Sequence, residues 1–439
     1  MTSRSARGDR AAGTPLRIDY EAFEEAEEDR YHPRDNPSGK IPLNIAENRL
    51  GWGELRGKIQ GVTADLAIPD WVAGYTEPRG APEFREAAAR FLSRHLTGCS
   101  VDPQHLAVSA GATSVIETTS LILGDPGDVA VIPAPSYPVY RQDIGNAAGL
   151  RRFDLITHHE PSDLADGPAL RIEHLDRAHR DISASGGRFR MLILTTPDNP
   201  TGGVYAPAIL EEVADWCIDH EIHLAVNEIY GLSLIDTGHP EIRGDYETDV
   251  RFVSFANVMK ARRSEYLHLW YALSKDLGIS GFRVGFAYSL SADFLRAYET
   301  LNLPRTVSNH TQWLLGHVLT DRDFMTAYVA ANKRRLTGAY ALVVGHLRDM
   351  DVPYVPARGS LFVWLDLSRW MHADTEEAEL GLWEEIFRSA GVLLTPGVGF
   401  GHAKRGLFRL VYPCVPREEL RLAMTRLKQY LEGKGRRGR

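Results

Sequence analysis

The chain has few cysteines, no long apolar run and no excess of basic residues. Its three cysteines, Cys99, Cys217 and Cys414, are far apart and form no Cys-x-x-Cys pair, which favours reduced thiols over a disulfide framework. No segment approaches the roughly 18 apolar residues of a membrane helix, and the N-terminus leads into no hydrophobic stretch. The net charge of −8 argues against nucleic acid as the main partner. We therefore expect a cytoplasmic protein with no membrane or nucleic-acid partner.

The apolar residues that are present form short runs separated by helical patterns. With 44% hydrophobic and 25% charged residues in 439, the chain can bury a large core of two or three units. The apolar runs lie at residues 106–108, 129–132, 191–194, 222–226, 267–271 and 284–287. Because they are continuous rather than alternating, they predict strands buried on both faces of a mostly parallel sheet. Two further runs, at 361–366 and 407–411, follow a long helical stretch and predict a smaller α+β unit.

Lys275 stands one serine beyond the end of an apolar run. A lysine at the mouth of a buried strand can lose its proton and form an imine with an aldehyde cofactor. Arg283 follows eight residues later, a spacing that lets its guanidinium return to hold the phosphate of that cofactor. The pair indicates a pyridoxal-phosphate (PLP) enzyme, whereas Lys275 alone is also typical of an ordinary strand end.

Other polar residues follow the predicted strands, where ligands of open parallel sheets bind. The Gly111-Ala112-Thr113 turn begins a helix and offers backbone N–H groups and a hydroxyl to a phosphate. Tyr137, between turn residues, can stack on a flat ring, although core packing is the commoner role of a tyrosine. The Asn-Pro-Thr-Gly turn at Asn199 can hold an amide ready to donate to a phenolate oxygen, or can be a plain turn.

Three more residues complete this set. Tyr230 can donate a second hydrogen bond to the same oxygen, and Asn227 would then face the ring nitrogen. Arg409 lies on a strand of the second unit, where its guanidinium can bind a carboxylate with two hydrogen bonds. A surface salt bridge is the alternative for Arg409.

In their order and spacing these motifs resemble the fold-type I PLP-dependent enzymes of the class I/II aminotransferase family, most of all the 1-aminocyclopropane-1-carboxylate (ACC) synthase-like branch. The resemblance runs from about residue 30 to 430, and its most specific stretches are 36–39, 46–50, 227–230, 274–278, 281–285 and 359–367. It implies an α/β fold like that of aspartate aminotransferase. The large domain would hold a mostly parallel seven-stranded-type sheet, beside a smaller α+β domain.

This resemblance also divides the chain. The termini are small, polar and rich in arginine, which is typical of disordered ends. The expected segments are a disordered leader at 1–15, an arm and part of the small domain at 16–70, the large PLP-binding domain at 71–304, the rest of the small domain at 305–432, and a basic tail at 433–439.

The resemblance implies PLP as cofactor and assigns the site residues. Lys275 is the Schiff-base lysine and, with Tyr230, is assigned to the catalytic residues. The expected cofactor-binding residues are Gly111, Ala112, Thr113, Tyr137, Asn199, Asn227, Tyr230, Ser274, Lys275, Arg283 and Tyr75. Arg409 binds the substrate carboxylate and Glu47 helps to set substrate choice. Tyr75 reaches the phosphate of the neighbouring subunit, which implies a homodimer with shared active sites.

The chain departs from the family at two positions. Asn227 stands where nearly all members have an aspartate, whose charge keeps the ring nitrogen protonated and the cofactor a strong electron sink. A neutral amide argues against efficient transamination, unless surrounding groups restore the protonation. Ala272 replaces a phosphate-binding hydroxyl, so Arg283, Thr113 and Ser274 would carry more of the phosphate.

The leading functional hypothesis is a PLP-dependent lyase or transferase that acts on S-adenosylmethionine. Lys275 would remove the α-proton, and methylthioadenosine would leave from the γ-carbon. The product would arise by ACC synthase-like ring closure or by carbon–carbon bond formation in a specialised biosynthesis. The alternatives are an aminotransferase, an amino-acid oxidase/cyclase, or a non-catalytic binding module, which the presence of Lys275 disfavours. No metal is expected, because His158-His159-Glu160 lacks a third ligand at a recognisable spacing.

Overall fold

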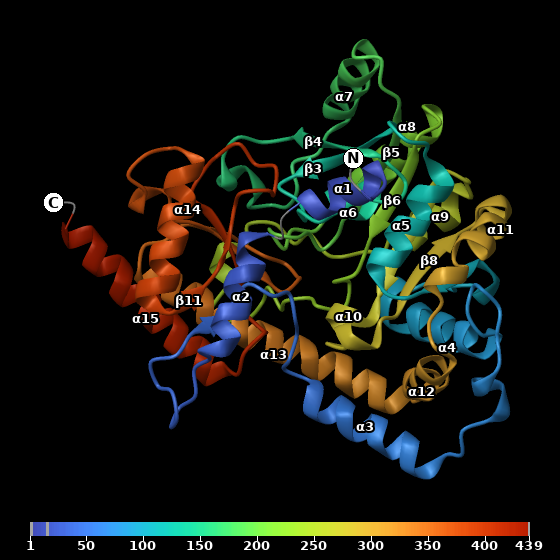
Figure 1. Ribbon diagram of the computed structural model, residues 1–439, viewed down its shortest axis with the longest axis horizontal. Coiled ribbons are helices and arrows are strands. Elements are labelled where there is room, and N and C mark those ends of the chain that lie inside the picture. Colours follow the sequence, from blue (N-terminus) through green and yellow to red (C-terminus); the bar gives the residue numbers. More distant parts are fainter. Residues whose placement is uncertain (1–2, 15–16, 438–439) are drawn as a thin grey trace.

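A computed structural model describes residues 3–14 and 17–437, with burial assigned up to residue 435. The chain forms two packed parts, each built around its own sheet (Figure 1). The long helix α13 (Arg322–Asp349) runs along both, from α12 (Asn309–Thr320) to the C-terminal helix α15 (Arg417–Arg437). No helix within the described residues has the length and apolar character needed to cross a membrane.

The large sheet has seven strands among the described residues, in the order β2-β8-β7-β6-β5-β3-β4. Only β8 runs antiparallel to its neighbours β2 and β7, and the remaining pairs are parallel. The strands are β2 (Leu106–Ser109), β3 (Val129–Ala134), β4 (Arg151–Ile156), β5 (Phe189–Thr195), β6 (His223–Asn227), β7 (Leu267–Ala272) and β8 (Gly285–Ser289). The prediction of a mostly parallel sheet from continuous apolar runs is therefore confirmed.

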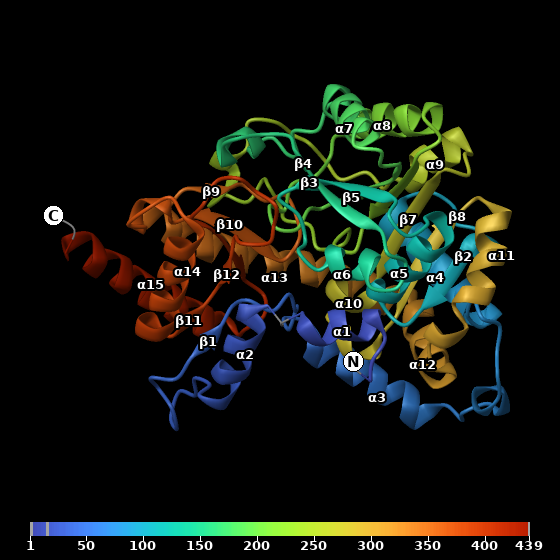
Figure 2. The same cartoon turned by 45° about the horizontal axis from the view of Figure 1, so that its top comes forward.

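Helices cover both faces of this sheet, which is why its strands are apolar throughout. Successive strand residues point to opposite faces. In β5, Leu192 and Leu194 pack on one face, which is covered by α4, α7, α8, α9 and α12. Met191 and Ile193 pack on the opposite face, which is covered by α5, α6 and α11. Figure 2 shows α7, α8 and α9 on one side of the strands and α5 and α6 on the other. The helices are α4 (Pro82–Leu92), α5 (Ala112–Leu123), α6 (Tyr140–Gly145), α7 (Ile172–Ala184), α8 (Pro207–Asp219), α9 (Ala256–Arg262), α10 (Leu273–Asp276) and α11 (Ala292–Leu301).

The second part joins the two ends of the chain. Its antiparallel sheet has the order β12-β13-β10-β9 and is packed against α13, α14 and α15. From the N-terminal side, β1 pairs in parallel with β11, and Ile41 and Leu43 enter the same apolar core. The elements are α2 (Ile18–Glu28), β1 (Ile41–Pro42), α3 (Trp52–Asp65), β9 (Tyr354–Val355), β10 (Phe362–Asp366), α14 (Glu376–Glu385), β11 (Val392–Leu393), β12 (Thr395–Pro396) and β13 (Leu407–Val411). The expected domain boundaries stay predictions.

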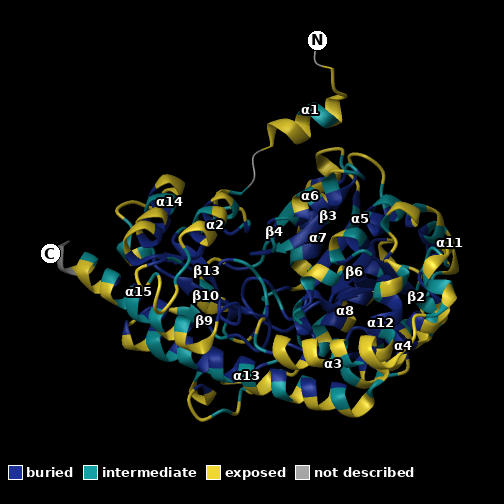
Figure 3. Cartoon of the chain, turned by 60° about the horizontal axis from the view of Figure 1, so that its bottom comes forward, coloured by how far each residue is buried: buried dark blue, intermediate teal, exposed yellow. Residues whose placement is uncertain are grey.

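Three features differ from the sequence-based expectations. The leader contains helix α1 (Ala6–Gly13), capped by the Ser5 hydroxyl, although none of its residues is buried (Figure 3). The basic tail continues α15 to residue 437, and no proline interrupts residues 417–437. Residues 1–2, 15 and 438–439 of these two predicted segments lie outside the described residues. Strand β4 was not expected, because it is a partly exposed edge strand with polar residues.

Candidate active site

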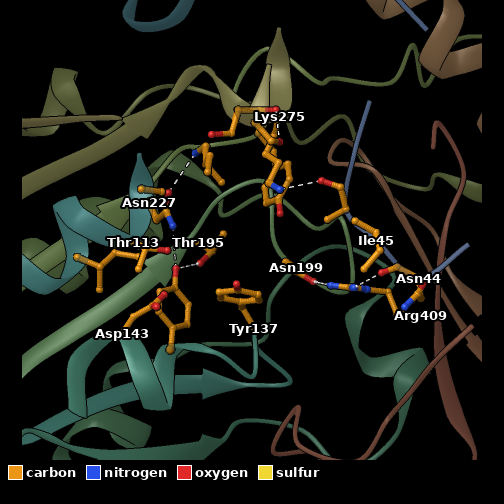
Figure 4. Close-up of a pocket in the computed structure, with 18 of the residues that line it drawn as sticks. Asn44, Ile45, Thr113, Tyr137, Asp143, Thr195, Asn199, Asn227, Lys275 and Arg409 are labelled. Atoms are coloured by element: carbon orange, nitrogen blue, oxygen red, sulfur yellow. Dashed lines mark hydrogen bonds between the residues drawn. The ribbon is translucent and has the colours of Figure 1, made fainter. Parts of the chain in front are cut away.

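A cavity of about 230 Å³ lies at the carboxyl ends of the large sheet and reaches into the second part of the chain (Figure 4). Strand β5 contributes Thr195, β6 contributes Asn227, and Lys275 lies just beyond β7. Arg409 reaches the cavity from β13 of the smaller sheet. The architecture thus brings together side chains that are more than 200 residues apart in the sequence.

Lys275 is in helix α10 and its Nζ donates a hydrogen bond to the carbonyl oxygen of Ala46, at 2.7 Å. Burial lowers the pKa of this amine to about 8, with Glu47 opposing the change and the cations Arg409 and Arg283 adding to it. A neutral amine is the form that attacks a carbonyl or accepts a proton. The lowered pKa makes this neutral form more accessible near neutral pH in Lys275 than in an exposed lysine.

The phosphate end of the cavity is formed by Arg283 and the N-terminus of α5. The Arg283 guanidinium donates to the carbonyl oxygens of Ser280 (2.8 Å) and Ala110 (3.4 Å). Gly111 has a φ of 91°, and a Cβ atom there would collide with the same guanidinium. The glycine thus keeps open a cradle between the arginine and the free N–H groups of the helix, which suits a phosphate.

The middle of the cavity provides a ring-binding surface. Tyr137 is largely buried and lies edge-on to Tyr140, with the ring centroids 5.4 Å apart. Burial raises the pKa of both Tyr137 and Tyr230, so each stays a neutral phenol. Asn199 accepts a hydrogen bond from Arg409 through Oδ1, at 3.0 Å, which leaves its Nδ2 as a donor. These residues fit a flat ring that carries a phenolate oxygen.

Asn227 has its amide orientation fixed by the backbone. Its Oδ1 accepts from the Ile229 N–H at 3.2 Å, and its Nδ2 donates to the Tyr140 hydroxyl at 2.9 Å. The reversed orientation would bring the amide nitrogen against the Ile229 N–H, two donors facing each other. The Tyr140 hydroxyl also bonds to Thr195 Oγ1, at 2.8 Å. The amide therefore carries no charge, and the Tyr140 hydroxyl accepts one of the hydrogen bonds that its Nδ2 can donate.

Arg409 is a buried cation with no carboxylate partner among the described residues. Its guanidinium donates to the Asn44 carbonyl oxygen (2.8 Å) and to Thr395 Oγ1 (3.3 Å), besides Asn199. It lies over the ring of Phe362, 4.6 Å from the centroid, and burial lowers its pKa. An unpaired buried charge is costly unless a ligand compensates it. A substrate carboxylate is such a ligand.

Most of the site residues expected from the sequence line this one cavity. They are Ala112, Thr113, Tyr137, Asn199, Asn227, Tyr230, Ser274, Lys275, Arg283 and Arg409. Gly111 lies behind Arg283, and Glu47 does not line the cavity but directly follows Ala46, which does; Glu47 forms a partly exposed ion pair with Arg49 at 2.9 Å. Tyr75 is fully exposed and does not line the cavity of its own chain. The individual roles of these residues stay predictions.

The cavity also contains residues that the sequence did not single out. They include Arg17, Tyr20, Asn44, Tyr140, Asp143 and Thr195. Tyr140 and Asp143 follow Tyr137 at intervals of three residues, a spacing that places side chains on one face of a helix and was available as a signal. Nothing in the sequence near Arg17 signals that the N-terminal segment folds back to the cavity.

Comparisons with known proteins agree with this geometry. Residues 38–427 match the family model for aminotransferase class I and II. ACC synthase 1 of Oryza sativa subsp. indica is 32% identical over 421 residues, which cover 93% of this chain and 84% of that protein. An ACC synthase of Glycine max is 27% identical, over 94% of this chain and 84% of that protein. The structure of Thermus thermophilus aspartate aminotransferase with maleate, 23% identical, superposes with a TM-score of 0.78 and covers 98% of this chain and 100% of that one, a likeness of fold. The chain therefore belongs to the class I and II aminotransferase family and is a PLP-dependent enzyme.

Proposed function

We propose that the enzyme acts at the α- and γ-carbons of S-adenosylmethionine and expels methylthioadenosine. The product would form by ring closure, as the names of the ACC synthase relatives suggest, or by carbon–carbon bond formation with a second molecule. One observation carries the amino-acid part of this proposal: a desolvated lysine amine and an unpaired arginine, Lys275 and Arg409, share one cavity. The departure of a group from the γ-carbon is supported by the similarity to the ACC synthases.

Each of these side chains has a distinct task. When bound, PLP stabilises negative charge that develops at the α-carbon of the amino acid. Arg409 binds the α-carboxylate with charge-assisted hydrogen bonds and so fixes which bond at the α-carbon faces Lys275. The neutral Lys275 amine removes the α-proton and holds it. Tyr137 and Tyr230, both buried, keep water from the reacting carbon.

Glu47 supports a cationic leaving group. Its carboxylate stands close enough to Lys275 to oppose the lowering of the lysine pKa. A sulfonium that enters this edge of the cavity is attracted by the carboxylate, whereas an uncharged thioether is not. We therefore expect S-adenosylmethionine to be preferred over methionine.

The test is to incubate the purified holoenzyme with S-adenosylmethionine and to measure methylthioadenosine by chromatography and ACC by mass spectrometry. Methylthioadenosine should be released by the wild type and not by the Lys275→Ala variant. Methionine serves as the matched substrate without a sulfonium. Release of no methylthioadenosine, together with keto-acid formation from common amino acids, would overturn the proposal in favour of an aminotransferase.

We further propose a cytoplasmic homodimer in which Tyr75 reaches the phosphate of the partner subunit. Tyr75 is fully exposed, and Thr113 and Arg283 at the phosphate end are exposed as well, so both surfaces can be covered by a second copy. All three cysteines are free, in agreement with a reducing compartment. Mixing Tyr75→Phe and Lys275→Ala subunits tests the shared site, because each mixed dimer keeps one site with both native residues. Activity absent from both parents should return in the mixture.

A further inference from the structure

Asp143 is the only carboxylate among the described residues that line the cavity. The same lining carries four cationic side chains, Arg17, Lys275, Arg283 and Arg409. Asp143 is 6% exposed, and its Oδ2 is buried with no hydrogen-bond partner anywhere in residues 3–14 and 17–437. It also forms no ion pair there. Buried carboxylates nearly always have a partner, so this one calls for a ligand that is cationic or donates a hydrogen bond.

The position of Asp143 selects which ligand group it faces. It lies on α6, one turn after Tyr140, whose hydroxyl joins Asn227 to Thr195. Figure 4 shows Asp143 on the side of Thr113, Thr195 and Asn227, across the cavity from Arg409. Asp143 is thus on the side of the cavity that Asn227 lines, the residue expected to face the ring nitrogen of PLP, and away from Arg409, the residue expected to bind the substrate carboxylate.

Asn227 leaves this end without a negative charge. The Ile229 N–H fixes its Oδ1, and its Nδ2 points a donor to Tyr140. A protonated ring nitrogen therefore gains no ionic partner from Asn227, while an unpaired carboxyl lies one helical turn beyond the hydroxyl that Asn227 contacts.

We propose that Asp143 supplies the negative charge that holds the ring nitrogen of PLP in its protonated form, in place of the acid missing at Asn227. The proton balance is simple: the Asp143 carboxyl becomes a carboxylate and the pyridine nitrogen becomes N–H⁺, either by direct transfer or through solvent. Asp143 is a positioning residue for a proton and makes no bond to the substrate. The inference rests on the PLP dependence of the chain and not on S-adenosylmethionine as substrate.

The surroundings of Asp143 agree with this role. Burial, and next the charge of Glu117, raise the pKa of the Asp143 carboxyl to about 7. Tyr140, whose pKa burial raises to about 12, and Tyr137 face it as neutral phenols. Glu117 is itself paired with Arg305, at 2.5 Å. With no cation paired to it in the described part of the chain, the carboxyl is poised between its two forms, and a pyridinium would favour the ionised one.

The test uses holoenzyme reconstituted with PLP that carries ¹⁵N at the ring nitrogen, without substrate. The ¹⁵N chemical shift distinguishes pyridinium from pyridine, so the readout is independent of activity and of the proposed substrate. We expect pyridinium in the wild type and pyridine in Asp143→Asn at the same pH. The double variant Asp143→Asn/Asn227→Asp should show pyridinium again, because the usual acid is restored.

Two controls separate a role in charge from a role in folding. Glu117→Gln removes a neighbouring carboxylate that does not line the cavity, and the nitrogen should stay protonated. Circular dichroism and the PLP absorbance establish that each variant folds and binds the cofactor. An unprotonated ring nitrogen in the wild type overturns the proposal even if Asp143→Asn fails to fold. Unchanged protonation in a folded Asp143→Asn overturns it as well.

Discussion

Replacing Lys275 by methionine is expected to stabilise the cofactor-free protein at neutral pH. Burial lowers the pKa of the lysine from 10.5 to about 8, which corresponds to roughly 3 kcal/mol of cost for keeping the charged amine in the fold. Methionine removes that cost but also the hydrogen bond from Nζ to the Ala46 carbonyl oxygen, worth about 1 kcal/mol. The free energy of unfolding should therefore rise by about 2 kcal/mol.

The effect has a defined pH dependence. Below pH 8 the amine is protonated in both the folded and the unfolded chain, and the full cost applies. Between about 8 and 10.5 the unfolded chain binds more protons, so the stability of the wild type rises with pH and the advantage of the variant shrinks. The same desolvation that destabilises the empty protein provides the neutral amine that the chemistry needs.

Denaturation of the cofactor-free proteins by urea, at neutral pH and at about pH 10, measures this difference. The matched control is Lys58→Met, which loses a partly exposed ion pair with Asp321 (2.5 Å) and should cost up to about 1 kcal/mol. A Lys275→Met variant less stable than the wild type at neutral pH, or a stability difference that is equal at both pH values, would contradict this prediction.

Three further predictions concern ligands. Arg409→Gln should raise KM for the amino-acid substrate by about 30-fold or more, because losing one partner of a buried charge pair costs about 2 to 5 kcal/mol. A KM close to that of the wild type would contradict the assignment of Arg409 to the substrate carboxylate. Gly111→Ala should weaken PLP binding about tenfold or more in a fluorescence titration, since alanine is strained at a φ of 91° and its methyl group meets Arg283. Unchanged affinity would contradict a phosphate site between Arg283 and the N-terminus of α5. Removing PLP should lower the melting temperature, because a ligand at 100 times its Kd adds about 2.7 kcal/mol, and equal melting of both forms would argue against a specific site.

The interior of the large sheet was predictable because burial on both faces demands apolar residues at every position. Strands β5, β6 and β7 are nearly fully buried, so their runs are continuous and easy to recognise. The edge strand β4 has one neighbour and a partly solvated surface, and its sequence, Arg-Arg-Phe-Asp-Leu-Ile, carries no such run. Helix α1 has no buried residue, so its formation depends on local capping by Ser5, which composition does not reveal.

The candidate site was predictable where a functional residue directly follows a buried strand. Asn227 and Lys275 are of this kind, since the strand before each fixes its place. Asp143 could not be predicted in this way, because it stands out only by having no hydrogen-bond partner on its buried Oδ2 among the described residues, and that is seen in the fold and not in the sequence. Arg17 reaches the cavity only because the N-terminal segment returns to the core of the second part, a long-range event that local patterns do not encode.

The charged side chains of the cavity can be compared with the charged groups of its expected ligands. Arg283 and Arg409 stand at separate ends, so they suit two anionic groups held apart, a phosphate of about −1.5 to −2 and an α-carboxylate. Burial lowers the pKa of Lys275 to about 8, so its amine gives up its charge more readily than that of an exposed lysine. Asp143 lies across the cavity from Arg409, on the side of Asn227, where we propose that it pairs with the one group of PLP that can become cationic. A ligand with a phosphate alone would leave the buried Arg409 without an anionic partner, so the cavity calls for the carboxylate of an amino acid besides the phosphate of the cofactor.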